Sequence, residues 1–326
     1  MMADERRDTG FARVSRAARA GARRIRRAVR PNGPAPTHVD APAPVTADDL
    51  KEIGSTLREI RDELRRHRRY IETIQLELSA QTLREVQMAI EPRQLDGLAT
   101  LDALTDTGRS FARFGDGEFR LALRPGFNLG FQSNRDGLRD ELRALLRTTS
   151  TEDLLVGFPH LFRDAHWSGV WADVWPELRE VIPGEGSYGD SHVTRPNFFA
   201  SHGQDGVEAW RRVWDRQRVC VIAGRGSRFE MVPALFDNVL SVQTLDAPST
   251  QAYDAIDDIE ARALDTRADV FLIALGPTGT LLAARLAAAG RQALDIGHLS
   301  SSYRTHFSGS ARPEAIASSR ATGASA

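Results

Sequence analysis

Apolar residues follow a heptad pattern between residues 46 and 90, where steps of four and three alternate along the chain. This pattern is typical of a helix that pairs with another helix along a narrow seam. Residues 46–49 (TADD) resemble a capping signal with acids in the first helical turn. The seam positions are Ile53, Leu57, Ile60, Leu64, His67, Ile71, Ile74 and Leu78. We therefore predict a coiled-coil helix over residues 46–90 that forms a homodimer; the alternative is a helix that packs back on the following domain.

The pattern changes near residue 91, where short apolar runs begin to alternate with amphipathic segments. The apolar runs predict buried strands at residues 110–114, 154–158, 218–223, 240–245, 270–275 and 292–296. Helical spacing predicts helices at residues 135–147, 167–178, 208–214, 229–236, 253–264 and 281–289. Alternating strands and helices predict an α/β domain over residues 91–308, with a mostly parallel sheet and helices on its faces.

The two ends of the chain do not share this organisation. Residues 1–45 form an arm that is Arg-rich and then rich in Pro and Ala, and residues 309–326 are rich in Ala and Ser. Both segments are expected to be disordered. For the arm three interpretations remain open: a solubilising tail, a peripheral contact with an anionic membrane surface, and a grip on nucleic-acid phosphates, the last being the least expected.

Composition excludes several classes of protein. The 326 residues are 41% hydrophobic and 27% charged, which suits one large globular domain or two ordinary ones. The single cysteine, Cys220, lies in an apolar run and can form neither an internal disulfide nor a zinc cluster. No apolar run approaches the ~20 residues of a membrane span, and the basic N-terminal stretch lacks the apolar segment of a signal peptide. These features favour a cytoplasmic protein.

Two carboxylates separated by one glycine stand in residues 113–118 (RFGDGE). Acids this close repel each other and lose solvation unless a cation or an exposed loop relieves them. A hard divalent cation prefers oxygen ligands, and Gly117 lets the backbone turn Asp116 and Glu118 towards one point. The alternative is a surface turn, because Asp-Gly is a common turn dipeptide.

A glycine-containing turn, residues 276–280 (GPTGT), lies between a predicted strand and a predicted helix. Backbone N–H groups at a helix N-terminus bind phosphate, and the hydroxyls of Thr278 and Thr280 add donors. The turn matches neither the dinucleotide fingerprint nor the P-loop, so these two classes are poorly supported. Asp295 and His298, at the end of the last strand, suit ribose binding, proton transfer or cation orientation. A helix cap without a ligand and a hydrogen-bonded strand end are the alternatives.

These motifs occur in an order that resembles one family. The motifs are RFGDGE at 113–118, GFQ at 130–132, TRP at 194–196, GPT at 276–278 and DIGH at 295–298. Their order resembles that of the bacterial GT-D fold glycosyltransferases, formerly a domain of unknown function (DUF1792), over about residues 95–307. The resemblance implies a Rossmann-like sheet of the GT-D type and a hexosyltransferase with a nucleotide-sugar donor, typically a UDP-sugar. It also implies Mn²⁺ or Mg²⁺ bound by Asp116 and Glu118.

The resemblance assigns expected roles to the remaining motif residues. Donor binding is expected of Arg113, Gln132, Arg195, Gly276, Pro277, Thr278 and Thr280. Asp295 and His298 are the expected catalytic residues, through acceptor activation or donor contact. One departure stands after the strand at 218–223, where the family often has an E-G-E pattern and this chain has Ala223-Gly224-Arg225. Arg228 and Phe229 still match.

Two classes of function remain open at this point. The first is a metal-dependent glycosyltransferase that acts on a glycan, glycoprotein or cell-envelope precursor, in the cytoplasm or at the inner face of the membrane. The second is a non-catalytic coiled-coil assembly or membrane-surface-binding protein with a degenerate glycosyltransferase domain. A metal-dependent phosphoesterase, which would need no sugar donor, is a third interpretation.

Overall fold

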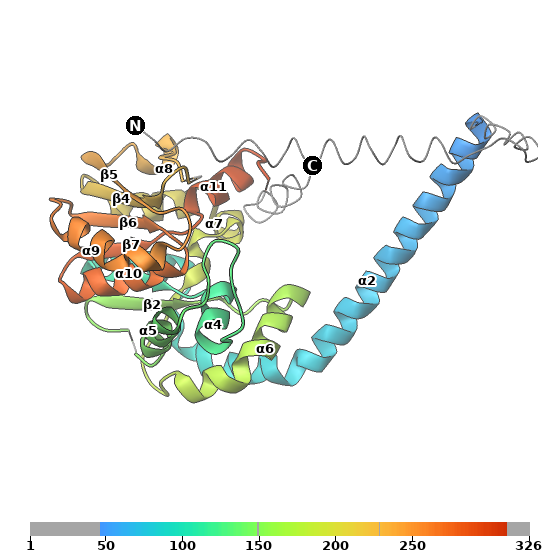
Figure 1. Cartoon of the computed structure of the whole chain (residues 1–326), viewed down its shortest axis with the longest axis horizontal. Helices are drawn as coiled ribbons and strands as arrows, with labels where there is room; N and C mark the ends of the chain where they lie inside the picture. Colours follow the sequence, from blue (N-terminus) through green and yellow to red (C-terminus); the bar gives the residue numbers. More distant parts are fainter. Residues whose placement is uncertain (1–45, 149, 228, 312–326) are drawn as a thin grey trace, which may run out of the picture. The chain divides into compact units, whose positions relative to one another are not determined.

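The computed structural model describes residues 46–148, 150–227 and 229–311. The predicted basic arm (residues 1–45), Arg228 and residues 312–326 of the predicted tail lie outside these ranges. The first described element is helix α2 (Ala47–Ile90), which is 44 residues long (Figure 1). Thr46 N–H donates to Asp49 Oδ2 over 2.7 Å and Asp49 N–H donates to Thr46 Oγ1 over 3.2 Å, a reciprocal cap that fixes the start of the helix. The predicted helix is confirmed, and its pairing stays a prediction.

The last turns of α2 belong to the compact part of the chain, which begins at Arg65. There α2 buries Ser79, Leu83, Val86 and Ile90. Gln75 Nε2 donates to Ala165 O over 2.7 Å, and Trp175 Nε1 donates to Glu85 Oε2 over 3.0 Å. Both bonds tie α2 to helix α6 (Ala165–Val181). None of the described helices is long and apolar enough to cross a membrane.

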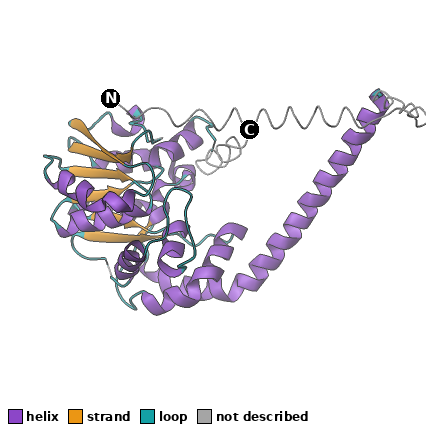
Figure 2. Cartoon of the chain, viewed as in Figure 1, coloured by secondary structure: helices purple, strands orange, loops and turns teal. Residues whose placement is uncertain are grey.

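Seven strands form one sheet, in the order β3-β2-β1-β7-β6-β4-β5, and every pair is parallel (Figure 2). The strands are β1 (Ser110–Arg113), β2 (Leu154–Phe158), β3 (Gly189–Asp190), β4 (Arg218–Gly224), β5 (Ser241–Ala247), β6 (Val270–Ala274) and β7 (Gln292–Asp295). The inner strands are apolar and buried on both faces, which explains why their sequences show continuous apolar runs rather than alternation. The predicted α/β fold is confirmed.

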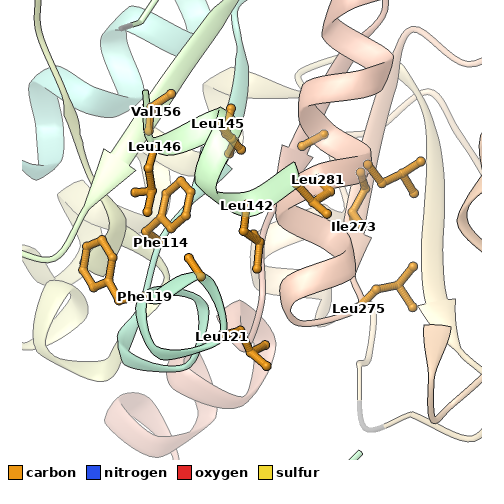
Figure 3. Close-up of a cluster of buried hydrophobic side chains, with 14 of the residues drawn as sticks. Phe114, Phe119, Leu121, Leu142, Leu145, Leu146, Val156, Ile273, Leu275 and Leu281 are labelled. Atoms are coloured by element: carbon orange, nitrogen blue, oxygen red, sulfur yellow. The ribbon is translucent and has the colours of Figure 1, made fainter. Parts of the chain in front are cut away.

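Helices cover both faces of the sheet and create two apolar cores. On one face lie α4 (Asp116–Leu123), α5 (Asp136–Leu146), α6, α9 (Ile256–Leu264) and α10 (Pro277–Ala288). On the other lie α3 (Gly97–Thr107), α7 (Pro196–Val213), α8 (Pro233–Phe236) and α11 (Leu299–Phe307). Short 3₁₀ helices are η1 (Glu91–Arg93), η2 (Ser191–Thr194) and η3 (Ala252–Ala255). Figure 3 shows Phe114, Phe119 and Leu142 of α5 among the buried side chains of the first core.

Several elements differ from the sequence prediction. The acidic residues 116–118 were expected in a turn after the strand at 110–114, but Asp116 begins helix α4. The helix predicted at 229–236 is confined to α8, because Pro233 occupies its first turn and the residues before it have no helical bonds. Helix α7 begins at Pro196, well before the predicted residue 208, and contains a break at Gly203. Helix α11 was not predicted.

The middle of the sheet is where the first and last strands meet. β1 pairs with β7, with Phe111 opposite Leu294. Helix α4, which follows β1, packs in one core, whereas Leu299 of α11, which follows β7, packs in the other. Connections that leave neighbouring strands towards opposite faces open a crevice at the carboxyl ends, the usual ligand position of such sheets.

Candidate functional site

Arg113 joins the carboxyl ends of β1 and β7. Its Nε–H donates to Asp295 O over 2.8 Å, Nη2 donates to Asp295 Oδ1 over 3.3 Å, and Nη1 donates to Ser191 O over 3.1 Å. Thr280 Oγ1 lies 2.9 Å from Arg113 O and 3.1 Å from Asp295 Oδ2, and its single proton serves one of them at a time. The Asp295 side chain also accepts from Gly297 N–H over 3.1 Å. These hydrogen bonds hold the ends of β1 and β7 together with Ser191 and with Thr280 near the start of α10.

The two predicted metal ligands stand in the first turn of α4. Gly115 N–H donates to Glu118 Oε2 over 2.9 Å, the bond that a carboxylate at the third helical position makes to the cap residue. The helix dipole favours negative charge at this end. Burial, and then the charges of Asp295 and Asp116, raise the pKa of Glu118 to about 7, against the opposing charge of Arg113. Burial is thus the main cause of the shift, and the two nearby carboxylates add to it.

Asp116 is the more accessible of the two acids, with a side chain that is 44% exposed. Its Oδ2 lies 3.4 Å from Arg120 Nη1 and 3.8 Å from His166 Nε2. Among the described residues no group of three or more His, Cys, Asp and Glu side chains is arranged to hold a metal ion. Two neighbouring carboxylates fit Mg²⁺ or Mn²⁺, which commonly take one or two protein carboxylates and complete their shell with substrate phosphates and water.

The glycine turn before α10 lies beside an exposed aromatic ring. Gly276 has φ of +57°, and a Cβ there would lie 2.9 Å from Phe131 Cε2. Both the backbone conformation and the close ring therefore require glycine. Pro277 takes the first helical position, where its missing N–H leaves no bond unmade. Phe131 itself is 45% exposed.

The hydroxyls and the amide that were predicted to contact a donor are used inside the protein. Thr278 and Thr280 are fully buried, and Thr278 Oγ1 donates to Gln132 Oε1 over 3.4 Å. Gln132 is 1% exposed; its Nε2 donates to Gln251 Oε1 over 3.3 Å and its Oε1 accepts from Tyr253 N–H over 3.3 Å. These side chains hold the loop around Phe131 against the start of α10, a role that their sequence context did not indicate.

A buried Asp–His pair beside Arg195 was missed by sequence analysis. His160 N–H donates to His192 Nδ1 over 3.1 Å, so that nitrogen carries no proton and its 3.9 Å separation from Asp190 Oδ1 is not an ion pair. Burial, and then the charge of Arg195, lower the pKa of His192 to about 3. Burial raises the pKa of Asp190 to about 6. The polar stretch 187–196 has no periodicity, and its one signal is the D-x-H triplet ahead of Arg195.

The two predicted catalytic residues, Asp295 and His298, differ in how far their side chains are exposed. Asp295 is 1% exposed and engaged by its neighbours, whereas His298 is exposed and precedes the first residue of α11. The structure brings Arg113, Thr280 and Asp295 into contact and places Glu118 within electrostatic range of them. Asp295 is therefore placed as a buried anchor and His298 as a surface residue.

At the end of β4 the chain departs from the E-G-E family pattern at Ala223 and Arg225, and it keeps the central glycine for a steric reason. A Cβ on Gly224 would lie 3.0 Å from Ser249 Cα, so the backbone of the neighbouring loop leaves room only for glycine. Arg225 is exposed, and Phe229 packs on Phe236 with ring centroids 5.9 Å apart.

Comparison with known proteins agrees with the motifs. Residues 111–317 match the glycosyltransferase GT-D fold family. The chain is 28% identical over 217 residues to glycosyltransferase GlyD of Streptococcus pneumoniae serotype 4, which covers 63% of this chain and 26% of that protein. It is 28% identical over 230 residues to the probable glycosyl transferase Gly of Streptococcus gordonii; the match covers 65% of this chain and 33% of that protein. The chain thus spans about a third or less of the length of these relatives.

Two solved structures are similar throughout the sheet-containing part. One, described as domain of unknown function 1792 with a distinct glycosyltransferase fold, has a TM-score of 0.63 at 25% identity and covers 71% of this chain and 86% of its own. The other, described as a new glycosyltransferase (DUF1792) from Streptococcus sanguinis, has a TM-score of 0.60 at 26% identity, covering 67% and 85%. The sheet order, the motif order and these matches agree, and this chain belongs to the GT-D fold glycosyltransferase family.

Proposed function

We propose that the chain is a metal-dependent glycosyltransferase that moves a sugar from a nucleotide-diphosphate donor, in the first instance a UDP-sugar, to a glycan, glycoprotein or cell-envelope acceptor. One observation carries the proposal. Arg113, the last residue of β1, lies with Glu118 and with Asp295, the last residue of β7, at the carboxyl edge of the sheet. Ligands of open α/β sheets bind at that edge, and family membership supports the class of reaction.

Asp116 and Glu118 would hold Mn²⁺ or Mg²⁺. Their oxygens suit a hard cation, and a cation would offset both the burial of Glu118 and the nearby charges of Asp295 and Asp116, which together raise its pKa. A divalent cation bound there supplies Lewis-acid assistance to the departure of the nucleoside diphosphate. Arg120 Nη1, 3.4 Å from Asp116 Oδ2, holds that carboxylate in place along the helix.

The turn at the start of α10 would bind the diphosphate through its backbone. N–H groups and the dipole at a helix N-terminus favour phosphate. The hydroxyls of Thr278 and Thr280 are in internal hydrogen bonds, so we assign them to the scaffold. Phe131, exposed beside Gly276, offers a ring face on which the nucleobase would stack.

Arg113 and Asp295 act as positioning residues in this proposal, because the Arg113 guanidinium is hydrogen-bonded to the Asp295 carboxylate and carbonyl. Their contact fixes the strand ends from which Asp116 and the α10 turn approach the donor. Arg195, which precedes Pro196 at the start of α7, would add positive charge on the diphosphate side. His298 is exposed at the start of α11 and is the residue that an acceptor hydroxyl reaches for proton transfer.

The test is calorimetric titration of UDP into the full chain with and without Mn²⁺. Binding is expected only with Mn²⁺, and Asp116→Ala and Glu118→Ala should each abolish it. The matched control is Asp106→Ala, which removes an exposed acid of α3, on the other face of the sheet; this variant should bind UDP like the wild type. Release of sugar from UDP-sugars with Mn²⁺ then identifies the donor.

Three outcomes would contradict the proposal. Failure to bind any nucleotide would support a non-catalytic assembly protein. Equal loss in Asp106→Ala would mean that the effect is not local. Phosphate release from simple esters, without any sugar donor, would support a phosphoesterase.

A further inference from the structure

Helix α2 carries a row of exposed apolar side chains that one histidine interrupts. We call this row the α2 seam; it consists of Leu50, Ile53, Leu57, Ile60, Leu64, His67, Ile71, Ile74 and Leu78. Its apolar side chains are between 50% and 81% exposed. The buried residues of α2 are Ser79, Leu83, Val86 and Ile90, and the earlier contact of the helix with α6 is made by Gln75; none of these belongs to the seam. A contiguous exposed apolar row of this length marks an interaction surface.

The heptad spacing of the seam residues indicates what kind of surface covers them. Steps of three and four persist over four heptads, the period at which helices interlock along their a and d positions. The complementary surface for such a row is another row with the same period, and each further copy of the chain supplies one. We infer that the α2 seams of four chains assemble into a parallel, in-register coiled coil.

Charges beside the seam determine the orientation. Counting Leu50 as position a, the e flank holds Arg61 and Arg68, and the g flank holds Glu63 and Glu77. In a parallel assembly each g flank faces the e flank of the next helix, and Glu63 comes opposite Arg68. An antiparallel assembly sets arginine against arginine. In its own helix Arg68 Nε lies 2.8 Å from Glu72 Oε1, at position b, so its guanidinium would be shared between Glu72 and Glu63 of the next helix.

The kinds of residue in the seam determine the number of helices. Position a is Leu in four of its five occurrences, and position d is Ile in three of its four. Ile is stiff at χ1 because of its branch at Cβ. In a parallel coiled coil of two helices, the side chain at position d points straight into the neighbouring helix, where the branch at Cβ is crowded. Leu at a with Ile at d therefore favours a coiled coil of four helices. The seam composition thus replaces the predicted dimer by a tetramer.

The one polar seam residue fixes the register. His67 occupies a d position, and in the parallel in-register assembly it meets the same residue of its neighbours in one layer. A shift by one heptad would set it against Ile60 or Ile74. A single polar layer in an apolar seam specifies register in this way, at a cost in stability.

Mass measurement of the full chain by light scattering after gel filtration tests the number of strands. The chain mass is 36.0 kDa, and a particle of four chains is expected; one, two or three chains would overturn the inference. The combined substitutions Leu57→Ile, Ile60→Leu, Leu64→Ile and Ile74→Leu conserve volume while exchanging branching between a and d. They should halve the mass, and an unchanged mass would refute the argument from branching. Arg69→Gln, opposite the seam at position f, is the control and should leave four chains.

Disulfide trapping tests the orientation and does not depend on the strand number. The native Cys220 is buried and does not interfere. Leu57→Cys and Ile74→Cys proteins, one carrying a mass tag, are mixed, unfolded, refolded together and oxidised. In a parallel in-register coil each cysteine joins its own kind, whereas an antiparallel coil, in which residue 57 faces residue 74, gives only the mixed product. Predominance of the mixed product would overturn the parallel arrangement, and no disulfide of either kind would overturn pairing through the seam.

Discussion

Gly297→Ala should damage the site through a single methyl group. Gly297 follows β7 with φ of +46°, and a Cβ there would overlap Arg113 Nη2 and lie 3.1 Å from Cζ. Two costs arise. A non-glycine residue in left-handed backbone costs about 1–2 kcal/mol. Displacing the guanidinium from the buried Asp295 carboxylate removes a charge-assisted hydrogen bond, which is worth about 1.5–3 kcal/mol. The expected loss of unfolding free energy is therefore about 3–5 kcal/mol.

Gly290→Ala separates the two costs. Gly290 ends the α10 connection with φ of +74°, and a Cβ there would meet nothing within 4 Å. It should cost about 1–2 kcal/mol, the backbone term alone. Urea unfolding of both variants measures the difference, and UDP titration should show a lower affinity only for Gly297→Ala. Equal destabilisation of the two variants, or a Gly297→Ala protein that binds UDP like the wild type, would refute the role given to the Arg113–Asp295 contact.

Three further predictions concern other parts of the chain. Thr280→Val keeps the shape of the side chain but removes the one hydroxyl proton that Arg113 O and Asp295 Oδ2 share; a loss of about 1–3 kcal/mol in urea unfolding is expected, and no loss would contradict it. Burial raises the pKa of Asp190 from 3.8 to about 6, so the folded state holds a proton that the unfolded state releases, and stability from this group falls as pH rises from 4 to 6. The unfolding free energy of Asp190→Asn, measured relative to the wild type by urea titration, should therefore rise by up to about 3 kcal/mol between pH 4 and pH 6. A difference between the two proteins that does not change with pH would contradict the shifted pKa. Deletion of residues 1–31 should abolish co-sedimentation with anionic vesicles, since that segment holds the Arg cluster; unchanged binding would rule out the arm as a membrane contact.

The fold was predictable where one local pattern dominates. Strand β2 was predicted with its observed bounds because Leu154–Phe158 is apolar throughout and buried on both faces. Helix α2 was predicted because its heptads continue over many turns and begin at a strong cap. Strand β3 was missed because Gly189 and Asp190 carry no apolar pattern; their pairing comes from the neighbouring β2.

The candidate site was predictable as a set of residue types, but not as a set of contacts. The acids of residues 113–118 indicated a cation, yet the Asp-Gly pair favoured a turn, and only tertiary packing of Phe119 and Leu121 makes the segment a helix. The contact between Thr280 and Asp295 joins two buried polar groups that no periodicity relates. Exposure decides between Asp295 and His298, and exposure depends on the packing of the whole sheet.

The pairing of β1 with β7 has a consequence for how the protein is made. Arg113 leaves the ribosome 182 residues before Asp295, and β7 is the only strand that pairs with both β1 and β6 among the described residues. During synthesis β1 can pair with β2 early, but its other edge has no neighbour until the end of the domain emerges. Such a nascent chain has no assembled site, and a chain that stops before Gln292 leaves two open sheet edges, which are templates for aggregation. The Arg113–Asp295 contact and the continuous seven-stranded sheet therefore form together, with the last strand.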